Sequence, residues 1–189
     1  HGEVADRIAG WMAENGGVMT KRDLKSYQAR LRNPVVSTYR DHKIVGFPPP
    51  SSGGIHVGQV LNILEPFPMS QYYQKDPAVY THVVAEAMKL AFADRAYWLG
   101  DSDFTRVPNG LLSKQYARQL SSRIDLKKAS DVEAHGVPPR RFPTKPERHT
   151  THIAVADAEG YWVAMTATIN TSFGSKVVIP GTGIIMNNE

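Results

Sequence analysis

The chain has no cysteine, so disulfide bonds, thiolate metal sites and a cysteine nucleophile are all excluded. It also has no apolar run near the about 20 residues that a membrane helix requires, and no basic and apolar leader at its start. Because the sequence opens with His-Gly-Glu-Val and no initiating Met, we treat it as a processed or excised piece. The missing leader therefore says nothing about export, and no membrane span is expected within these residues.

Neither sign of charge dominates, since 22 Lys and Arg residues stand against 18 Asp and Glu residues. One small basic cluster holds Arg140, Arg141, Lys145 and Arg148. Nucleic-acid binding usually needs a denser basic stripe with stacking aromatics, so no nucleic-acid partner is expected. With 189 residues, 41% of them hydrophobic, the chain is long enough for one ordinary domain with a real core.

Helical periodicity dominates the first part of the chain. Residues 4–15 place apolar side chains on one face, and Gly16-Gly17 ends that helix. Asp76-Pro77 is an N-cap followed by proline at the first helical position, and it predicts a helix that ends near Gly100. Further helices are predicted from a capping box at residues 20–23, after the prolines at 48–50, and over residues 111–123.

Strand patterns appear twice. Val35 to Tyr39 and Lys43 to Phe47 flank Asp41-His42 and predict a short hairpin. Apolar and polar residues alternate again from residue 151, then a turn from Asp157 to Gly160 leads into a returning strand that ends at Thr168. A further strand is predicted over residues 184–187. We therefore divide the chain into a mostly helical part (1–132), a Pro-rich basic linker (133–149) and a β-rich tail (150–189).

Several chemical motifs have a plain structural interpretation. Gly181-Thr-Gly183 lacks the third glycine of a dinucleotide fingerprint and predicts a turn. Asp101-Ser-Asp103 could bind a cation, but it is more typical of an Asx turn after a helix. The Ser51–Gly54 stretch is interpreted as a capped helix start with glycines for close packing, and the alternative is backbone contact with an anion. His149 and His152 lie in a loop and a strand, where their side chains point apart, so no metal site is expected.

Thr150 is the first residue of the β-rich tail, directly after the linker. Cleavage between His149 and Thr150 would make its Oγ a nucleophile and its new α-amino group the adjacent base. A free α-amino group has a pKa of about 7.7–8, which suits a general base near neutral pH. Taken alone, Thr150-Thr151 is better explained as a pair of threonines that begins a strand by propensity.

Three stretches of the tail nevertheless resemble the start of the small subunit of gamma-glutamyltransferases. They are Thr-Thr-His-Ile-Ala-Val-Ala-Asp from Thr150, the run from Thr166 to Ser175, and the run from Gly183 to Glu189. Upstream stretches agree with the same family in the same order, at residues 15–24, 48–56, 61–65 and 93–101. The resemblance covers nearly the whole chain.

The resemblance implies an α+β fold, the αββα sandwich of N-terminal-nucleophile hydrolases, incomplete in this fragment. It implies a precursor that cleaves itself at His149–Thr150 into a large and a small subunit, which remain together as a heterodimer. The activity implied is transfer of a γ-glutamyl group from glutathione or a related amide to water or an amino acid, without metal or cofactor.

By position in the motifs, Thr150 matches the nucleophile and Thr168 matches the threonine that tunes its amino group. Asn170 and Glu189 match residues that hold the α-amino and α-carboxylate ends of the glutamyl group, and a carboxylate at Glu189 suits a substrate ammonium. The family's substrate-carboxylate arginine is expected upstream of this sequence, and its serine pair and oxyanion glycines downstream. Loss of such donors typically costs about 10²–10³ in rate, so the fragment alone is expected to be a poor catalyst.

Two alternatives remain. A related amidohydrolase or acylase would use the same threonine on cephalosporin side chains, oxamate or poly-γ-glutamate. A non-catalytic homologue would serve as an interaction domain, although the presence of Thr150, Thr168 and Asn170 together argues against it.

Family habit, with support from the absence of cysteine, predicts a periplasmic or secreted protein. Fractionation of the producing cells checks this prediction, because mature protein found only in the cytoplasm would contradict it.

Overall fold

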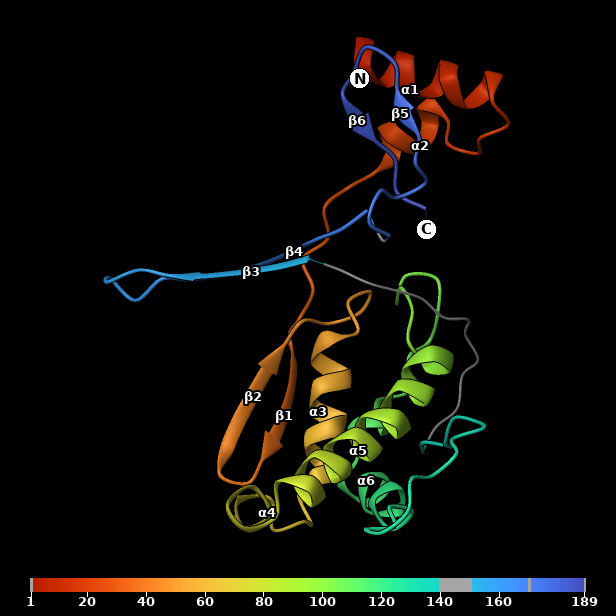
Figure 1. Ribbon diagram of the computed structural model, residues 1–189. Helices are drawn as coiled ribbons and strands as arrows, with labels where there is room; N and C mark the ends of the chain where they lie inside the picture. Colours follow the sequence, from red (N-terminus) through yellow and green to blue (C-terminus); the bar gives the residue numbers. More distant parts are fainter. Residues whose placement is uncertain (1, 140–150, 170, 189) are drawn as a thin grey trace. The chain divides into compact units, whose positions relative to one another are not determined.

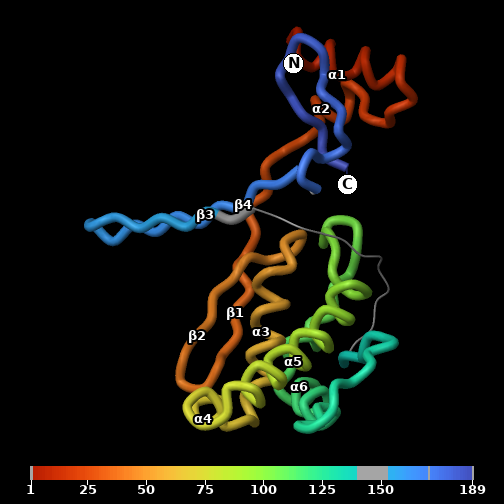
Figure 2. The backbone as a smooth tube through the Cα atoms, in the orientation of Figure 1, coloured from red at the N-terminus to blue at the C-terminus, as the bar shows by residue number. Residues whose placement is uncertain are grey.

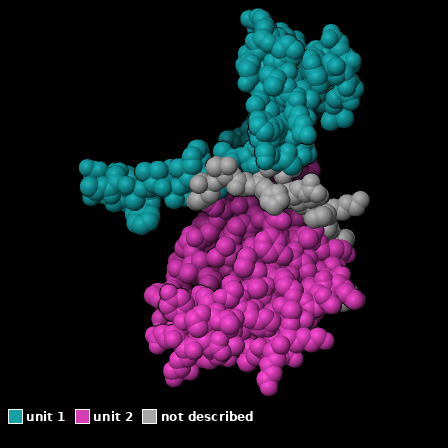
Figure 3. Space-filling view, in the orientation of Figure 1, with its two compact units in different colours: residues 1–31, 148–189 teal, residues 32–147 magenta. Residues whose placement is uncertain are grey.

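The computed structural model describes residues 2–139, 151–169 and 171–188. The chain forms two compact units, one made of His1–Leu31 with Arg148–Glu189 and the other of Arg32–Glu147 (Figure 3). The N-terminal residues thus group with the C-terminal tail rather than with the segment that follows them. No helix among the described residues has both the length and the apolar character needed to cross a membrane.

The second unit is built around three helices, α3 (Gly53–Leu64), α5 (Pro77–Trp98) and α6 (Lys114–Ser121) (Figure 1). The start of α5 confirms the predicted cap, since Val79 N donates to Asp76 Oδ1 at 3.1 Å and proline follows at the first helical position. Its end at Trp98 agrees with the predicted stop near Gly100.

Close packing between these helices forms the core. The α5 side chains that face the core include Val83, Ala87 and Ala91, all fully buried, and their small size lets α3 and α6 approach. Ile63 on α3 and Leu111 are buried as completely. Other members of the same cluster are Ile55, Leu64, Met69, Leu90, Trp98, Leu99, Tyr116, Ala117 and Leu120.

The hairpin of this unit pairs β1 (Val35–Tyr39) with β2 (His42–Gly46). Tyr39 pairs with His42, so the turn occupies Arg40 and Asp41 rather than the predicted Asp41-His42. The shift follows from Arg40, which takes a left-handed φ of 51° and closes the hairpin one residue earlier. The hairpin contacts α3.

The helix predicted over 111–123 is two elements, the 3₁₀ helix η1 (Asn109–Leu112) and α6. Ser113 separates them because its backbone is extended, and its Oγ accepts a hydrogen bond from Tyr116 N to cap α6. The remaining helix, α4 (Met69–Lys75), precedes α5.

The first unit contains α1 (Glu3–Glu14) and α2 (Lys21–Ser26). Gly16 follows α1 with a φ of 72°, as expected for a glycine that ends a helix. The capping box is confirmed, with Thr20 N donating to Asp23 Oδ2 at 2.8 Å. The hydrogen bonds from Thr20 lower the pKa of Asp23.

The same unit holds two hairpins (Figure 1). One pairs β3 (Thr151–Ala156) with β4 (Trp162–Ala167), and the other pairs β5 (Val178–Ile179) with β6 (Ile184–Ile185), both antiparallel. The first hairpin agrees with the predicted strands and turn, and β6 lies within the predicted strand over 184–187, whereas its partner β5 was not predicted.

Candidate functional site

Of the predicted site residues, Thr168 alone belongs to the described part of the chain. It follows β4 directly and its side chain is exposed. His149, Thr150, Asn170 and Glu189 lie outside the described residues. The described residues next to these positions are 151–169 and 171–188.

The β3–β4 hairpin fixes the register beside Thr168. Thr151, at the start of β3, pairs with Ala167, at the end of β4. The turn is closed at Asp157, whose N–H donates to Tyr161 O at 3.1 Å and whose carboxylate accepts from Tyr161 N at 2.8 Å. The first residue of one strand thus lies opposite the last residue of the other, next to Thr168.

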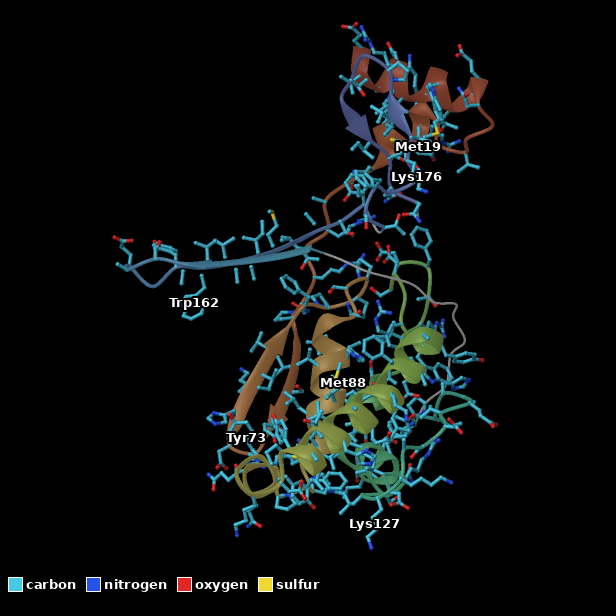
Figure 4. All side chains as sticks on the ribbon, in the orientation of Figure 1. Met19, Tyr73, Met88, Lys127, Trp162 and Lys176 are labelled. Carbon is cyan, nitrogen blue, oxygen red and sulfur yellow. The ribbon has the colours of Figure 1, made fainter. Side chains whose placement is uncertain are left out.

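Both faces of this hairpin are exposed within the described chain. Trp162 is 83% exposed and projects from the extended ribbon (Figure 4). Ile153, Val155, Val163 and Met165 are also about half exposed or more, so both alternating faces carry apolar side chains without cover. An isolated two-stranded ribbon is marginal in water, and these faces are suited to burial against further elements.

A second structural feature joins the segments that flank Asn170 and Glu189. Thr171 N donates to Asn188 Oδ1 at 3.2 Å, and Thr171 Oγ1 lies 3.1 Å from the same oxygen. We call this pair the clasp. It brings the residue after Asn170 into contact with the residue before Glu189, although the two are far apart in sequence.

The backbone around the clasp is closely packed. Ser175 N donates to Met186 O, and Met186 N donates to Val177 O, both at 2.9 Å. Gly174 has a φ of 53°, and a Cβ built there would lie 2.1 Å from Met186 O. Glycine is therefore required, because a side chain would push apart the two segments that the clasp joins.

Thr171 and Asn188 carry no separate signal in the sequence that predicts their contact. Both lie inside the quoted family motifs, next to the predicted substrate-binding positions. Their pairing could not be derived from the motifs, because nothing local links residue 171 to residue 188.

The β5–β6 turn supports this arrangement. Gly181 and Gly183 have φ values of 70° and 69°, which confirms that this glycine pair forms a turn. Ile179 is fully buried, and Arg7 Nη1 on α1 donates to Gly181 O at 3.1 Å. A helix from the start of the chain thus contacts the hairpin that lies between the two residues of the clasp.

The Ser51–Gly54 stretch begins α3 with the predicted close packing at its glycines, but the N-cap Ser52 makes no side-chain cap hydrogen bond. Ser51 Oγ accepts from Gly53 N at 3.3 Å, and Gly54 N donates to Phe47 O at 3.2 Å. A Cβ on Gly54 would lie 2.4 Å from Phe47 O, so the glycine permits close approach of β2 and α3. These amides already have protein acceptors, which leaves little reason for an anion here.

The Asp101–Asp103 turn is likewise accounted for by protein groups. Asp103 N donates to Asp101 Oδ1 at 3.0 Å, which is the predicted Asx turn. Arg32 forms ion pairs with both carboxylates, at 3.2 Å to Asp101 and 2.8 Å to Asp103. Within the described ranges, no cluster of His, Asp or Glu could hold a metal ion.

The chain is similar to known proteins over its whole length. The family model for gamma-glutamyltranspeptidase matches residues 1–189. A glutathione hydrolase proenzyme of Escherichia coli (strain K12) is 42% identical over 189 residues, covering 100% of this chain and 32% of the relative. The acylase ACY 1 proenzyme of Pseudomonas sp. (strain SE83) is 41% identical, covering 99% and 32%. The chain thus spans about a third of the length of these curated relatives.

Solved structures give the same grouping. The gamma-glutamyltranspeptidase of Helicobacter pylori superposes with a TM-score of 0.62 at 41% identity, over 69% of this chain and 37% of that one. The cephalosporin acylase of Bacillus halodurans superposes with a TM-score of 0.78 at 32% identity, over 99% of this chain and 32% of that one.

The clasp can be tested by hydrogen exchange. In Asn188→Ala the Thr171 amide loses its acceptor, so we expect it to exchange about fivefold faster, equivalent to a hydrogen bond of about 1 kcal/mol. Thr171→Val is the matched control, since it keeps the N–H and removes only the hydroxyl. NMR-detected exchange at residue 171 gives the answer, and equal protection with and without the Asn188 side chain would contradict the clasp.

Proposed function

The chain belongs to the gamma-glutamyltranspeptidase family, and on that premise we propose that it carries the catalytic threonine of a gamma-glutamyl hydrolase and transferase. Thr150 is the proposed nucleophile, and glutathione or a related γ-glutamyl amide is the proposed substrate. The observation that carries the proposal is the hairpin register, Thr151 opposite Ala167. Thr168 directly follows the residue that pairs with Thr151, and Thr151 directly follows Thr150 in the sequence.

The enzyme would activate itself by cleaving its own chain. The Thr150 hydroxyl adds to the carbonyl carbon of His149, and the peptide C–N bond breaks as the nitrogen takes a proton. The resulting ester is hydrolysed by water, which leaves a carboxylate on His149 and a free α-amino group on Thr150. Both curated relatives named above are proenzymes, which supports a processing step.

Turnover would reuse the same two groups. The Thr150 α-amine accepts the proton of its own hydroxyl as Oγ attacks the γ-carbonyl carbon of the substrate. The proton then passes to the leaving amine, and a γ-glutamyl ester remains on Thr150. Water or an amino acid resolves this ester and regenerates the hydroxyl. A hydroxyl at Thr168 beside the amine would orient it and tune its basicity.

Asn170 and Glu189 would hold the two charged ends of the glutamyl group. The clasp supports this role, since it joins Thr171 to Asn188 and so couples the segments next to both positions. A Glu189 carboxylate would accept hydrogen bonds from the substrate ammonium, and such charge-assisted bonds are about twice as strong as neutral ones.

We further propose that this chain forms part of an αββα sandwich that is completed by elements outside the sequence. The exposed apolar faces of β3 and β4 support it, because a two-stranded ribbon needs cover to be stable. After cleavage, residues 1–149 would end the large subunit and residues 150–189 would begin the small subunit of a heterodimer.

An acylase is the second candidate. The acylase proenzyme is nearly as similar as the glutathione hydrolase proenzyme, at 41% against 42% identity, and the cephalosporin acylase superposes over 99% of the chain. Parallel assays of the complete enzyme with glutathione and with a cephalosporin amide would separate the two. Turnover of the cephalosporin amide alone would favour the acylase.

Self-cleavage makes a direct prediction. Purified full-length protein is expected to run as two fragments, with Thr-Thr-His at the start of the smaller one, because Thr150 supplies the attacking oxygen. Thr150→Ala is expected to remain uncleaved, and Thr150→Ser to cleave because it keeps a hydroxyl. Electrophoresis and N-terminal sequencing are the measurements. Cleavage of the alanine variant at the same bond would instead implicate an outside protease, one drawn to Arg140-Arg141.

Thr168→Val tests the tuning hydroxyl, since valine keeps the branching and volume. We expect turnover and processing to fall about tenfold, the equivalent of about 1.4 kcal/mol in the transition state. Thermal stability should change by no more than about 1 kcal/mol, the usual worth of one hydrogen bond. Thr166→Val, on the same face of β4, is the matched control. Normal turnover in Thr168→Val would leave Thr168 as a strand residue only.

A further inference from the structure

A row of side chains on α5 binds the backbone of the segment that leads toward the cleavage region. We call residues 125–139 the anchor segment. His82 Nε2 lies 2.7 Å from Asp125 O, and Ser130 N donates to Glu86 Oε2 at 3.1 Å. Lys89 Nζ donates to Ser130 O. Figure 2 traces this segment as it leaves α6 and runs beside α5.

The row continues to the end of the helix. Gly136 N donates to Asp94 Oδ1 at 2.6 Å, and Trp98 Nε1 donates to Gly136 O at 3.2 Å. The two side chains thus hold both backbone groups of Gly136, and we call this the Gly136 clamp. Residues 82, 86, 94 and 98 are spaced in steps of four or eight, which keeps them on one slowly winding stripe of the helix.

The clamp is part of the core. Asp94 is fully buried, and its Oδ2 also accepts from Gln59 Nε2 at 2.5 Å and Tyr116 Oη at 2.7 Å. Burial, together with the hydrogen bond to Asp94, raises the pKa of Tyr116, so its hydroxyl stays protonated as a donor. Three donors for one carboxyl are what a buried polar group requires.

Contacts on both sides of Gly136 hold the rest of this stretch. The His135 ring stacks on Tyr97 with centroids 3.5 Å apart, and Pro138 is fully buried. A Cβ on Gly136 would lie 2.0 Å from Tyr116 Oη, and a Cβ on Gly110 would lie 2.3 Å from Pro139 O. His135, Gly136 and Pro138 are therefore held closely against the helices, whereas most other residues of the anchor segment are exposed.

The clamp lies close in the sequence to the proposed cleavage bond. Only residues 140–149 separate Pro139 from Thr150, and ten residues span at most about 35 Å when fully extended. On the other side of the bond, β3 begins at Thr151 and is held by its pairing with β4. In the sequence, the His149–Thr150 bond therefore follows the clamp by fewer than fifteen residues and directly precedes β3.

We propose that Asp94 and Trp98 are positioning residues for self-cleavage, acting through Gly136 on the chain that carries the His149–Thr150 bond. This inference rests on the proposed function, because it assumes that Thr150 attacks the His149 carbonyl. A held end reduces the conformations that the chain between Pro139 and Thr150 must give up to reach the reactive geometry. Releasing it slows processing without altering the nucleophile or the substrate site.

The test follows processing of newly translated full-length protein over time by electrophoresis. Trp98→Phe removes one donor to Gly136, and Gly136→Ala drives a Cβ against Tyr116, so both disturb the clamp. We expect each to slow processing about fivefold or more. Asp94→Ala also leaves the buried donors of Gln59 and Tyr116 unpaired, so it costs stability as well and is the less selective variant.

Tyr116→Phe is the matched control. It removes a hydrogen bond from the same Asp94 carboxyl but leaves both bonds to Gly136 in place. We expect it to process within twofold of the wild-type rate, even where its unfolding temperature falls as far as that of Trp98→Phe. Unfolding is measured in the Thr150→Ala background, so that every variant is compared as an uncleaved chain.

A second readout separates positioning from general damage. Once processed, Trp98→Phe and Gly136→Ala should show wild-type kcat and KM per cleaved molecule, because the clamp contacts no substrate. The inference is overturned where both variants process at the wild-type rate, or where processing of all three variants simply follows stability. A wild-type protein that never cleaves itself refutes the proposed function instead, so the two failures are distinguishable.

Discussion

The buried Asp94 carboxyl is the interaction on which the larger unit depends. It accepts hydrogen bonds from Gln59 on α3, Tyr116 on α6 and the backbone of Gly136, while itself belonging to α5. A single side chain thus joins the three core helices and the segment that follows them. Replacing it requires all three donors to find other partners in a space without water, which explains why a polar group occupies the centre of an apolar core.

The same helix also holds the backbone of the anchor segment. Glu86 shows how: burial alone would raise the pKa of its carboxyl, but hydrogen bonds from Lys89 and Ser130 lower it overall. Its charge is thereby kept available for the backbone N–H of Ser130. Side chains that satisfy a loop's backbone in this way allow an irregular segment to pack like regular structure.

The candidate site depends on pairing between strands and turns of the smaller unit. The β3–β4 register brings Thr168 to the open end of the hairpin, and the clasp between Thr171 and Asn188 joins the two segments that follow. Both require glycines at left-handed positions, Gly160 in the first turn and Gly174 beside the clasp. The predicted catalytic and substrate-binding positions thus adjoin, in the sequence, residues whose pairing the structure describes.

Several helix caps and turns could be predicted from the sequence alone, because they depend on interactions between residues that are close in the chain. The cap of Asp76 on α5, the Thr20–Asp23 capping box and the β3–β4 hairpin depend on residues close together in the sequence, so their patterns predict them. The β5–β6 hairpin was predicted only in its second strand. The family motifs also predict that Thr168 tunes the amino group of the nucleophile. Two local predictions were wrong. Arg40 has a left-handed backbone conformation, which moves the turn of the first hairpin, and Ser113 has an extended one, which separates η1 from α6.

Only the tertiary structure decided the rest. Several contacts join residues that are separated in the sequence. They link Gly136 to Asp94, Asn188 to Thr171, and α1 to the β5–β6 turn. Such contacts leave no periodicity, since each depends on how helices and hairpins pack rather than on neighbours along the chain. The sequence therefore predicted which residues do the chemistry, and packing decided which residues distant in the sequence contact one another.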